Sequence, residues 1–180
     1  MSLVNLTING KAVAVPSGTK ILEAAKQVGI KIPSLCQMKI DEIGFTNECA
    51  SCRVCMVSAG RKLVPACGTM VKEGMVVNTN TPEALKYRKN VVELLLSDHP
   101  QDCYTCAKSG KCELQDLAAD MGIRKIRFKG EQSTSPIDTS SYSIVKDNDK
   151  CILCRRCETM CTEVQTVGVL SGVNRGFNTV

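Results

Sequence analysis

The chain has 180 residues and a mass of 19.5 kDa, enough for one ordinary domain or two or three small ones. It has 12 cysteines, no apolar run near the roughly 18 residues of a membrane span, and no secretory signal at its start. We therefore expect a cytoplasmic protein whose cysteines bind metal or clusters rather than form disulfides. The formal charge of +5 assumes neutral thiols, so it gives little support to a nucleic-acid partner.

The first residues predict a β-hairpin followed by a helix. Residues 3–8 and 12–15 alternate apolar and polar side chains, though imperfectly. Asn9-Gly10 between them is the strongest short hairpin signal, because both turn positions need a positive φ. Thr19 can cap the following helix, and Gly29 is placed to end it. A hairpin and then a helix open a β-grasp fold, so we expect the α+β class.

Further short strands are expected at residues 54–57, 62–64 and 74–78. They would complete a β-grasp domain over residues 1–79.

A second helical region is expected over residues 80–128. Thr81-Pro82 is a helix start, with Thr as the cap and Pro at the first helical position, and Pro100 stops the helix. A shorter helix runs from Cys112 to Met121. Residues 129–142 are polar and rich in Ser and Thr, which predicts a linker to a last domain at residues 143–180.

The most basic segment is residues 124–129, where Arg124, Lys125, Arg127 and Lys129 are interleaved with apolar side chains. We expect a strand with a solvated basic face. A docking patch for an acidic electron carrier is the alternative. No nucleic-acid partner is expected, because neither stacking aromatics nor a recognition motif accompanies the segment.

Four closely spaced cysteines near the C-terminus form a C-x2-C-x2-C-x3-C run: Cys151, Cys154, Cys157 and Cys161. This is the ligand spacing of bacterial-type 4Fe–4S ferredoxins, although Thr162 replaces the usual Pro. Zinc is the alternative, but structural zinc favours two separated pairs of ligands. In two-cluster ferredoxins the fourth cysteine ligates the other cluster. Either Cys161 closes its own cluster, or the chain is the front of a longer protein, which we favour.

A second group has the spacing H-x3-C-x2-C-x5-C and consists of His99, Cys103, Cys106 and Cys112. We interpret it as a 4Fe–4S site with one histidine ligand, in which Gly110 lets the loop turn back to its last cysteine. Imidazole is neutral where thiolate is negative, so this cluster should be easier to reduce. The alternatives are zinc held by the same four side chains and a histidine that takes no part.

The third group holds five cysteines, one more than a 2Fe–2S cluster needs. We choose Cys36, Cys52, Cys55 and Cys67 as its ligands, because the first follows the hairpin and helix as in plant-type ferredoxins. Cys49 would then be a free thiol. The alternative is a 4Fe–4S cluster held by Cys49, Cys52, Cys55 and Cys67.

The order of these motifs, SLC…SCRVC…PAC, HPQDCYTCAKSGKCELQ and DNDKCILCRRCETMCTEVQ, resembles the N-terminal region of NAD-linked, electron-bifurcating iron-only (FeFe) hydrogenase large subunits. The large iron–sulfur subunit of respiratory complex I and some NAD-linked formate dehydrogenases share this order. The resemblance covers nearly the whole chain, and the motif of one histidine and three cysteines is its most specific part. It implies a second 4Fe–4S triplet, to which Cys161 would belong, and an H-cluster domain beyond Val180.

The resemblance implies one-electron relay through one 2Fe–2S and two 4Fe–4S clusters, from a flavin/NADH-oxidising subunit towards a hydrogen-forming centre. It also implies a small 2Fe–2S subunit as a partner, with ferredoxin as a further possibility. No catalytic nucleophile, acid/base pair or phosphate loop is recognisable, so we expect no bond-making site in this chain. A formate dehydrogenase or complex-I-like subunit and a zinc-stabilised scaffold are the alternatives.

Overall fold

The computed structural model describes residues 2–45, 47 and 50–180. The chain divides into two compact units, residues 1–90 and 91–180. Among the described residues, no helix combines the length and the apolar character that crossing a membrane requires.

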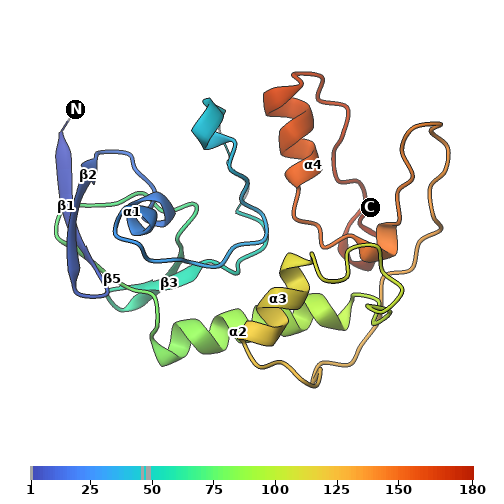
Figure 1. The fold of residues 1–180 in the computed structure, drawn as a ribbon, viewed down its shortest axis with the longest axis horizontal. Coiled ribbons are helices and arrows are strands. Elements are labelled where there is room, and N and C mark those ends of the chain that lie inside the picture. The colour runs from blue at the N-terminus through green and yellow to red at the C-terminus, as the bar shows by residue number, and fades with distance from the viewer. Residues whose placement is uncertain (1, 46, 48–49) are drawn as a thin grey trace. The chain divides into compact units, whose positions relative to one another are not determined.

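A five-stranded mixed sheet forms the centre of the first unit (Figure 1). β1 (Leu3–Ile8) pairs antiparallel with β2 (Lys11–Pro16) and parallel with β5 (Met75–Asn78). β3 (Met56–Ala59) pairs antiparallel with β5 and with β4 (Lys62–Pro65), so the strand order is β2-β1-β5-β3-β4. Together with the helix that follows β2, this sheet confirms the expected α+β class.

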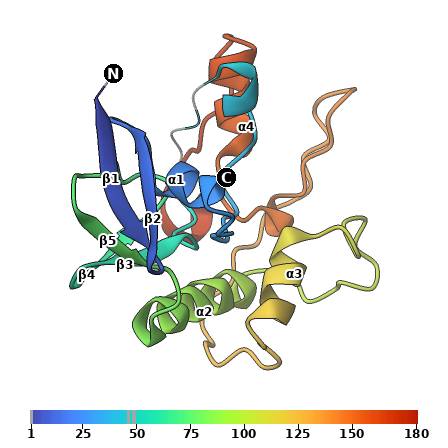
Figure 2. The ribbon, with the colours of Figure 1, turned by 60° about the vertical axis from the view of Figure 1, so that its left-hand side comes forward.

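The hairpin between β1 and β2 forms as the sequence predicts. Asn9 and Gly10 have φ values of 49° and 81°, the left-handed conformations that this turn requires. The helix α1 (Ile21–Gln27) then covers the sheet (Figures 1 and 2) and ends before Gly29, whose φ is 72°. Buried side chains of the helix and the strands form one core: Leu6, Ile8, Val15, Ile21, Leu22, Ala24, Ala25, Val57 and Val77.

The start of α1 differs from the prediction. The Thr19 hydroxyl does not cap the helix, because it donates to the carbonyl of Pro16 at 2.7 Å. The first helical N–H groups, those of Ile21 and Leu22, donate instead to carbonyls of the 66–69 loop at 2.9 and 3.0 Å. A tertiary contact therefore satisfies donors that a side chain was expected to satisfy.

The helix α2 (Pro82–Ser97) continues across the boundary between the two units. Its N-terminus is capped as predicted, since the N–H of Ala84 donates to Oγ1 of Thr81 at 3.3 Å. It ends three residues before Pro100. The short helix α3 (Glu113–Asp120) has Cys112 as its N-cap residue, which also agrees with the prediction.

The remaining elements are single turns. Asp41–Ile43 in the first unit is a 3-10 turn. The second unit has 3-10 turns at Asn148–Lys150 and Gly176–Asn178. Between them, α4 (Arg156–Thr159) runs directly into a π-helical turn at Met160–Val164.

The second unit has a small apolar core. Among its described residues, the buried apolar side chains are Val92, Leu114 and Cys161. Polar contacts instead connect distant segments: the N–H of Ser133 donates to Asp98 at 2.6 Å. A unit with so little buried apolar surface is of the kind that metal or covalent cross-links usually stabilise.

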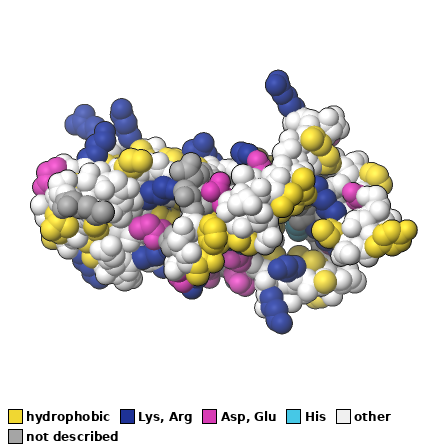
Figure 3. Space-filling model, turned by 90° about the horizontal axis from the view of Figure 1, so that it is seen from above, with side chains coloured by type: hydrophobic (Ala, Val, Ile, Leu, Met, Phe, Trp, Pro, Cys, Tyr) yellow, Lys and Arg dark blue, Asp and Glu magenta, His cyan; other side chains and the backbone are white. Residues whose placement is uncertain are grey.

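The expected strand at residues 124–129 is wrong, because this segment is irregular. Arg127 lies on the surface but is held by an ion pair to Glu93 of α2, at 2.7 Å between Nη2 and Oε2. On the face drawn in Figure 3, the lysine and arginine side chains are dispersed among acidic, polar and apolar ones.

Candidate metal centres

Four cysteines of the first unit lie together, although they come from three separate stretches of chain. Cys36 follows α1, Cys52 and Cys55 bound the turn before β3, and Cys67 follows β4. The sulfurs of Cys55 and Cys67 are 3.3 Å apart, and the thiol of Cys36 is hydrogen-bonded to those of Cys52 and Cys67. All four are buried. These are the four that the sequence singles out, whereas Cys49 lies outside the described residues.

Backbone N–H groups surround these sulfurs. The N–H of Leu35 donates to Sγ of Cys52 at 3.4 Å, and that of Val54 donates to the same sulfur. Arg53, which lies between Cys52 and Val54, has a φ of 56°. A left-handed residue in a turn can direct successive N–H groups to one side, a geometry that binds anions and iron–sulfur clusters.

The thiols also change one another's acidity. The thiol of Cys52 donates to Cys36 and lowers its pKa, and the thiol of Cys67 lowers the pKa of Cys55 to about 7. The same contacts, together with burial, raise the pKa values of Cys52 and Cys67. Part of the group is therefore poised to ionise, and thiolate is the form that binds metal.

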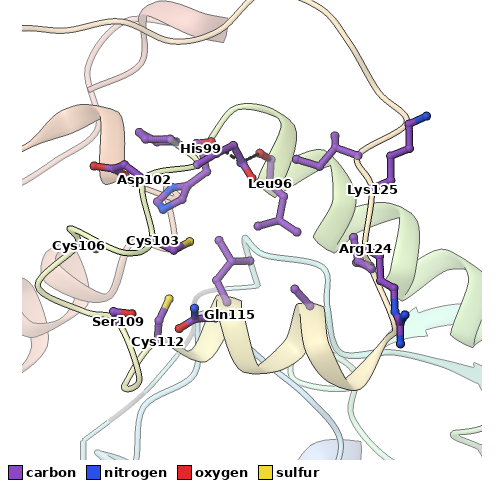
Figure 4. Close-up of a pocket in the computed structure, with 16 residues that line it drawn as sticks. Leu96, His99, Asp102, Cys103, Cys106, Ser109, Cys112, Gln115, Arg124 and Lys125 are labelled. Atoms are coloured by element: carbon purple, nitrogen blue, oxygen red, sulfur yellow. Dashed lines mark hydrogen bonds between the residues drawn. The ribbon is translucent and has the colours of Figure 1, made fainter.

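The second group lines a cavity of about 200 Å³ (Figure 4). His99 follows the end of α2, Cys103 and Cys106 lie in the loop, and Cys112 begins α3. Figure 4 shows the imidazole of His99 and the thiols of Cys103 and Cys112 directed into the same space. Apolar side chains, including Leu96, complete the lining.

Two glutamines stabilise the ends of this loop. The side chain of Gln101 donates to the carbonyls of Leu96 and His99 at 2.9 and 2.7 Å. Gly110 has a φ of 74° where the loop turns back, and its N–H donates to Gln115 of α3 at 3.2 Å. The loop is therefore attached to both helices that flank it.

The imidazole of His99 is suited to bind a metal. Its Nδ1 atom is buried and has no hydrogen-bond partner among the described residues. Burial lowers the pKa of His99 and so favours the neutral ring, and neutral imidazole is the metal-binding form. A buried polar atom without a partner is costly, and a cluster iron in the adjoining cavity would satisfy it. The four side chains therefore fit the expected cluster.

The third group is less enclosed. Cys151, Cys154 and Cys157 are exposed or half-buried, whereas Cys161 is buried in the π-helical turn. Burial raises the pKa of the Cys154 thiol, and Cys151 and Cys157 add to that rise.

As in the first group, this loop has left-handed residues, and its backbone N–H groups donate to cysteine sulfurs. Leu153 and Arg155 have φ values of 52° and 61°. The N–H of Leu153 donates to Sγ of Cys151 at 3.4 Å, and the N–H of Arg156 donates to Cys154.

In the described part of the chain, no group of three or more His, Cys, Asp or Glu side chains is arranged to hold a single metal ion. A cluster makes a different demand, because its four protein ligands are shared among two or four irons.

Two protein-family models match parts of the chain. Residues 2–82 match the model of a 2Fe-2S iron-sulfur cluster binding domain. Residues 88–127 match the NADH-ubiquinone oxidoreductase-G iron-sulfur binding region. The chain is therefore similar to the iron–sulfur regions of G-type subunits of NADH-quinone oxidoreductases and of hydrogenases that reduce NAD or NADP.

The relatives include both hydrogenase and quinone-reductase subunits. The chain is 53% identical over 182 residues to the NADP-reducing hydrogenase subunit HndD of Solidesulfovibrio fructosivorans, covering 100% of this chain and 31% of the relative. It is 38% identical over 180 residues to the NADH-ubiquinone oxidoreductase 75 kDa subunit of Reclinomonas americana, covering 98% of this chain and 25% of the relative. The chain thus spans about a third or less of the length of these two relatives.

One solved structure has the same fold as this chain. A chain of the NAD+-reducing [NiFe]-hydrogenase in the H2-reduced state superposes with a TM-score of 0.86 at 27% identity, covering 98% of this chain and 73% of that chain.

Two buried charged residues near these sites escape the sequence analysis. Arg88 and Glu93 are both buried on α2. The spacing of Arg88 and Val92 places Arg88 on the apolar face of the helix, but nothing in the sequence identifies a partner for either charge. Only the tertiary structure shows that one is hydrogen-bonded to β3 and the other to the 124–129 segment.

Proposed function

We propose that this chain relays single electrons through three iron–sulfur clusters and performs no bond chemistry itself. Iron–sulfur clusters, when bound, accept and release single electrons. The observation that carries the proposal is the cavity shared by His99, Cys103, Cys106 and Cys112, in which the imidazole has a buried nitrogen without a partner among the described residues.

The proposed ligands follow from the three groups. The 2Fe–2S cluster takes Cys36, Cys52, Cys55 and Cys67; one 4Fe–4S cluster takes His99, Cys103, Cys106 and Cys112; and a second 4Fe–4S cluster takes Cys151, Cys154 and Cys157, with Cys161 either completing it or serving a further cluster. The protein's own contribution is to ionise the thiols, exclude water and direct N–H groups at the sulfurs. These are the means by which proteins tune cluster potentials.

The domain organisation is part of the same proposal. Residues 1–79 would form a β-grasp 2Fe–2S domain, residues 80–128 the histidine-ligated domain, and residues 143–180 the start of a bacterial-type ferredoxin domain, with residues 129–142 as a linker.

The more specific assignment is to an electron-bifurcating FeFe hydrogenase. It is supported by the 53% identity to a subunit of an NADP-reducing hydrogenase. In that assembly the partners would be a flavin/NADH-oxidising subunit, a small 2Fe–2S subunit and ferredoxin. A complex-I-like subunit is the second candidate, supported by the 38% identity to the 75 kDa subunit of an NADH-ubiquinone oxidoreductase.

An anaerobic assay of iron and acid-labile sulfide tests the relay proposal. We expect roughly ten irons per chain if all three sites fill, or about six if the third stays empty. Electron paramagnetic resonance (EPR) of the reduced chain should show both 2Fe–2S and 4Fe–4S signals. A colourless protein with stoichiometric zinc would rule out the relay. Hydrogen-dependent reduction of the clusters in the complex from its source separates the hydrogenase from the complex-I-like assignment.

A further inference from the structure

Arg88 is a buried cation in the unit that holds the first four cysteines. It lies on α2, and 4% of its surface is exposed. Its Nε donates at 2.8 Å to the carbonyl of Met56, the residue that follows Cys55. The guanidinium therefore lies against the backbone of the residue that follows a proposed ligand.

No carboxylate among the described residues balances this charge. The Nη2 atom of Arg88 is buried and has no hydrogen-bond partner in the part of the chain that the structure describes. Burial lowers the pKa of Arg88, and the charge of Cys55 raises it. The group that acts electrostatically on Arg88 is thus a sulfur of the candidate site.

Glu93, a buried charge on the same helix, differs from Arg88 in having a counter-charge. Glu93 is equally buried, but Arg127 neutralises it at 2.7 Å. A buried charge without a counter-charge is strongly destabilising. The fold would retain Arg88 at such cost only if a negative charge were supplied nearby, and a thiolate-bound cluster supplies it.

We propose that Arg88 is the counter-charge of the cluster at Cys55 and its three neighbouring cysteines, and that it sets the reduction potential of that cluster. This inference rests on the proposed relay function. Reduction adds one negative charge to a cluster that is already anionic, so a fixed buried cation favours the reduced form. Because Nε of Arg88 donates to the Met56 carbonyl, its charge would act on the cluster through the electric field and through that carbonyl.

Three variants of the 180-residue chain test this role. Arg88→Gln removes the charge and keeps an N–H donor, whereas Arg88→Lys keeps both the charge and a donor. Lys86→Gln is the matched control, because it removes the same charge from an exposed position on the same helix. The measurement is the ratio of reduced to oxidised 2Fe–2S cluster at a fixed potential, followed by EPR during a redox titration, together with iron per chain.

We expect Arg88→Gln to lower this ratio about tenfold, equivalent to about 59 mV for one electron. Arg88→Lys and Lys86→Gln should stay within about twofold of the wild type, because the first keeps the buried charge and the second removes a solvated one. A shift in Arg88→Gln no larger than that in Lys86→Gln would overturn the inference while leaving the relay intact.

Loss of the cluster is also informative. If Arg88→Gln fails to hold the 2Fe–2S cluster and Arg88→Lys holds it, the charge is required for loading, which supports the inference. If both variants fail, Arg88 serves packing, and the inference is wrong. A wild-type chain without any 2Fe–2S signal would instead overturn the proposed function, and this inference with it.

Discussion

Nη1 of Arg156 lies 2.5 Å from Oε2 of Glu113, 43 residues earlier in the chain. Arg156 directly precedes Cys157, and Glu113 directly follows Cys112. The ion pair therefore joins a residue next to one proposed 4Fe–4S cluster to a residue next to the other.

A second ion pair repeats this arrangement. Nζ of Lys150 lies 3.4 Å from Oδ2 of Asp102, and these residues precede Cys151 and Cys103. Two connections between the same two loops restrain both their separation and their relative rotation. Electron transfer between the two sites depends on that separation.

Breaking the first pair should weaken the coupling between the two sites. We expect Arg156→Glu to reduce the spin–spin interaction between the two reduced clusters in EPR, with iron content unchanged. The double variant Arg156→Glu/Glu113→Arg should restore it, because the reversed charges attract again. Each pair is partly exposed, so the effect on stability should be small, about 0.5 kcal/mol.

Arg155 provides the control for this experiment. It pairs at 2.5 Å with Glu158, three residues further along the chain, so this ion pair stays within a single loop. Arg155→Gln should leave the spin–spin interaction as it is in the wild type. An equal loss in both variants would show that the ion pair between the loops does not set the geometry.

The pair of Glu93 and Arg127 should matter more for stability. Glu93 is 1% exposed and accepts bonds from the backbone and side chain of Arg127. Replacing Arg127 by Gln leaves a buried carboxylate without its counter-ion. We expect the midpoint of thermal unfolding to fall by about 5 °C.

Replacing Glu93 instead of Arg127 should destabilise the protein less. Glu93→Gln leaves the guanidinium of Arg127 in contact with water, since 60% of that side chain is exposed. We expect it to lower the unfolding midpoint by less than half as much as Arg127→Gln. Arg124→Gln, at an exposed position of the same segment, should leave the unfolding midpoint unchanged. Equal effects of the two partners would contradict the asymmetry.

These contacts mark the limit of what the sequence can predict. Two predictions from short sequence patterns are confirmed: Asn9-Gly10 makes the hairpin turn, and Thr81 caps α2. The predicted Thr19 cap is wrong, because a loop more than 40 residues further along the chain accepts the hydrogen bonds of the first helical N–H groups. The spacing of the cysteines identifies candidate ligands where these lie close together in the sequence, as Cys151, Cys154 and Cys157 do. The burial of Arg88 and Glu93 depends on partners that no local pattern specifies.

The left-handed residue Leu153 should tolerate glycine better than a β-branched side chain. Its φ of 52° is costly for a branched residue and free for glycine. We expect Leu153→Val to destabilise the loop by about 1–2 kcal/mol and to lower the iron bound by the third site. Leu153→Gly should retain that iron. Equal iron content in the two variants would show that the strain is relieved when the cluster binds.

Two cysteines three residues apart should behave differently. Cys52 lies among the buried thiols of the first unit, and Cys49 is expected to be a free thiol. We expect Cys52→Ser to abolish or strongly alter the 2Fe–2S signal and Cys49→Ser to leave it intact. Loss of the signal in Cys49→Ser, with retention in Cys36→Ser, would favour the alternative ligand set of Cys49, Cys52, Cys55 and Cys67.

Replacing His99 by cysteine should keep a cluster in the second site but make it harder to reduce. The substitution exchanges a neutral imidazole for a thiolate, which adds one negative charge to the cluster. We expect the midpoint potential of this cluster to fall by on the order of 100 mV, measured by an EPR-monitored redox titration. His99→Ala should lose this cluster or expose one of its irons to solvent. A potential unchanged in His99→Cys would mean that His99 is not a ligand, and its Nδ1, which has no partner among the described residues, would then need another occupant of the cavity.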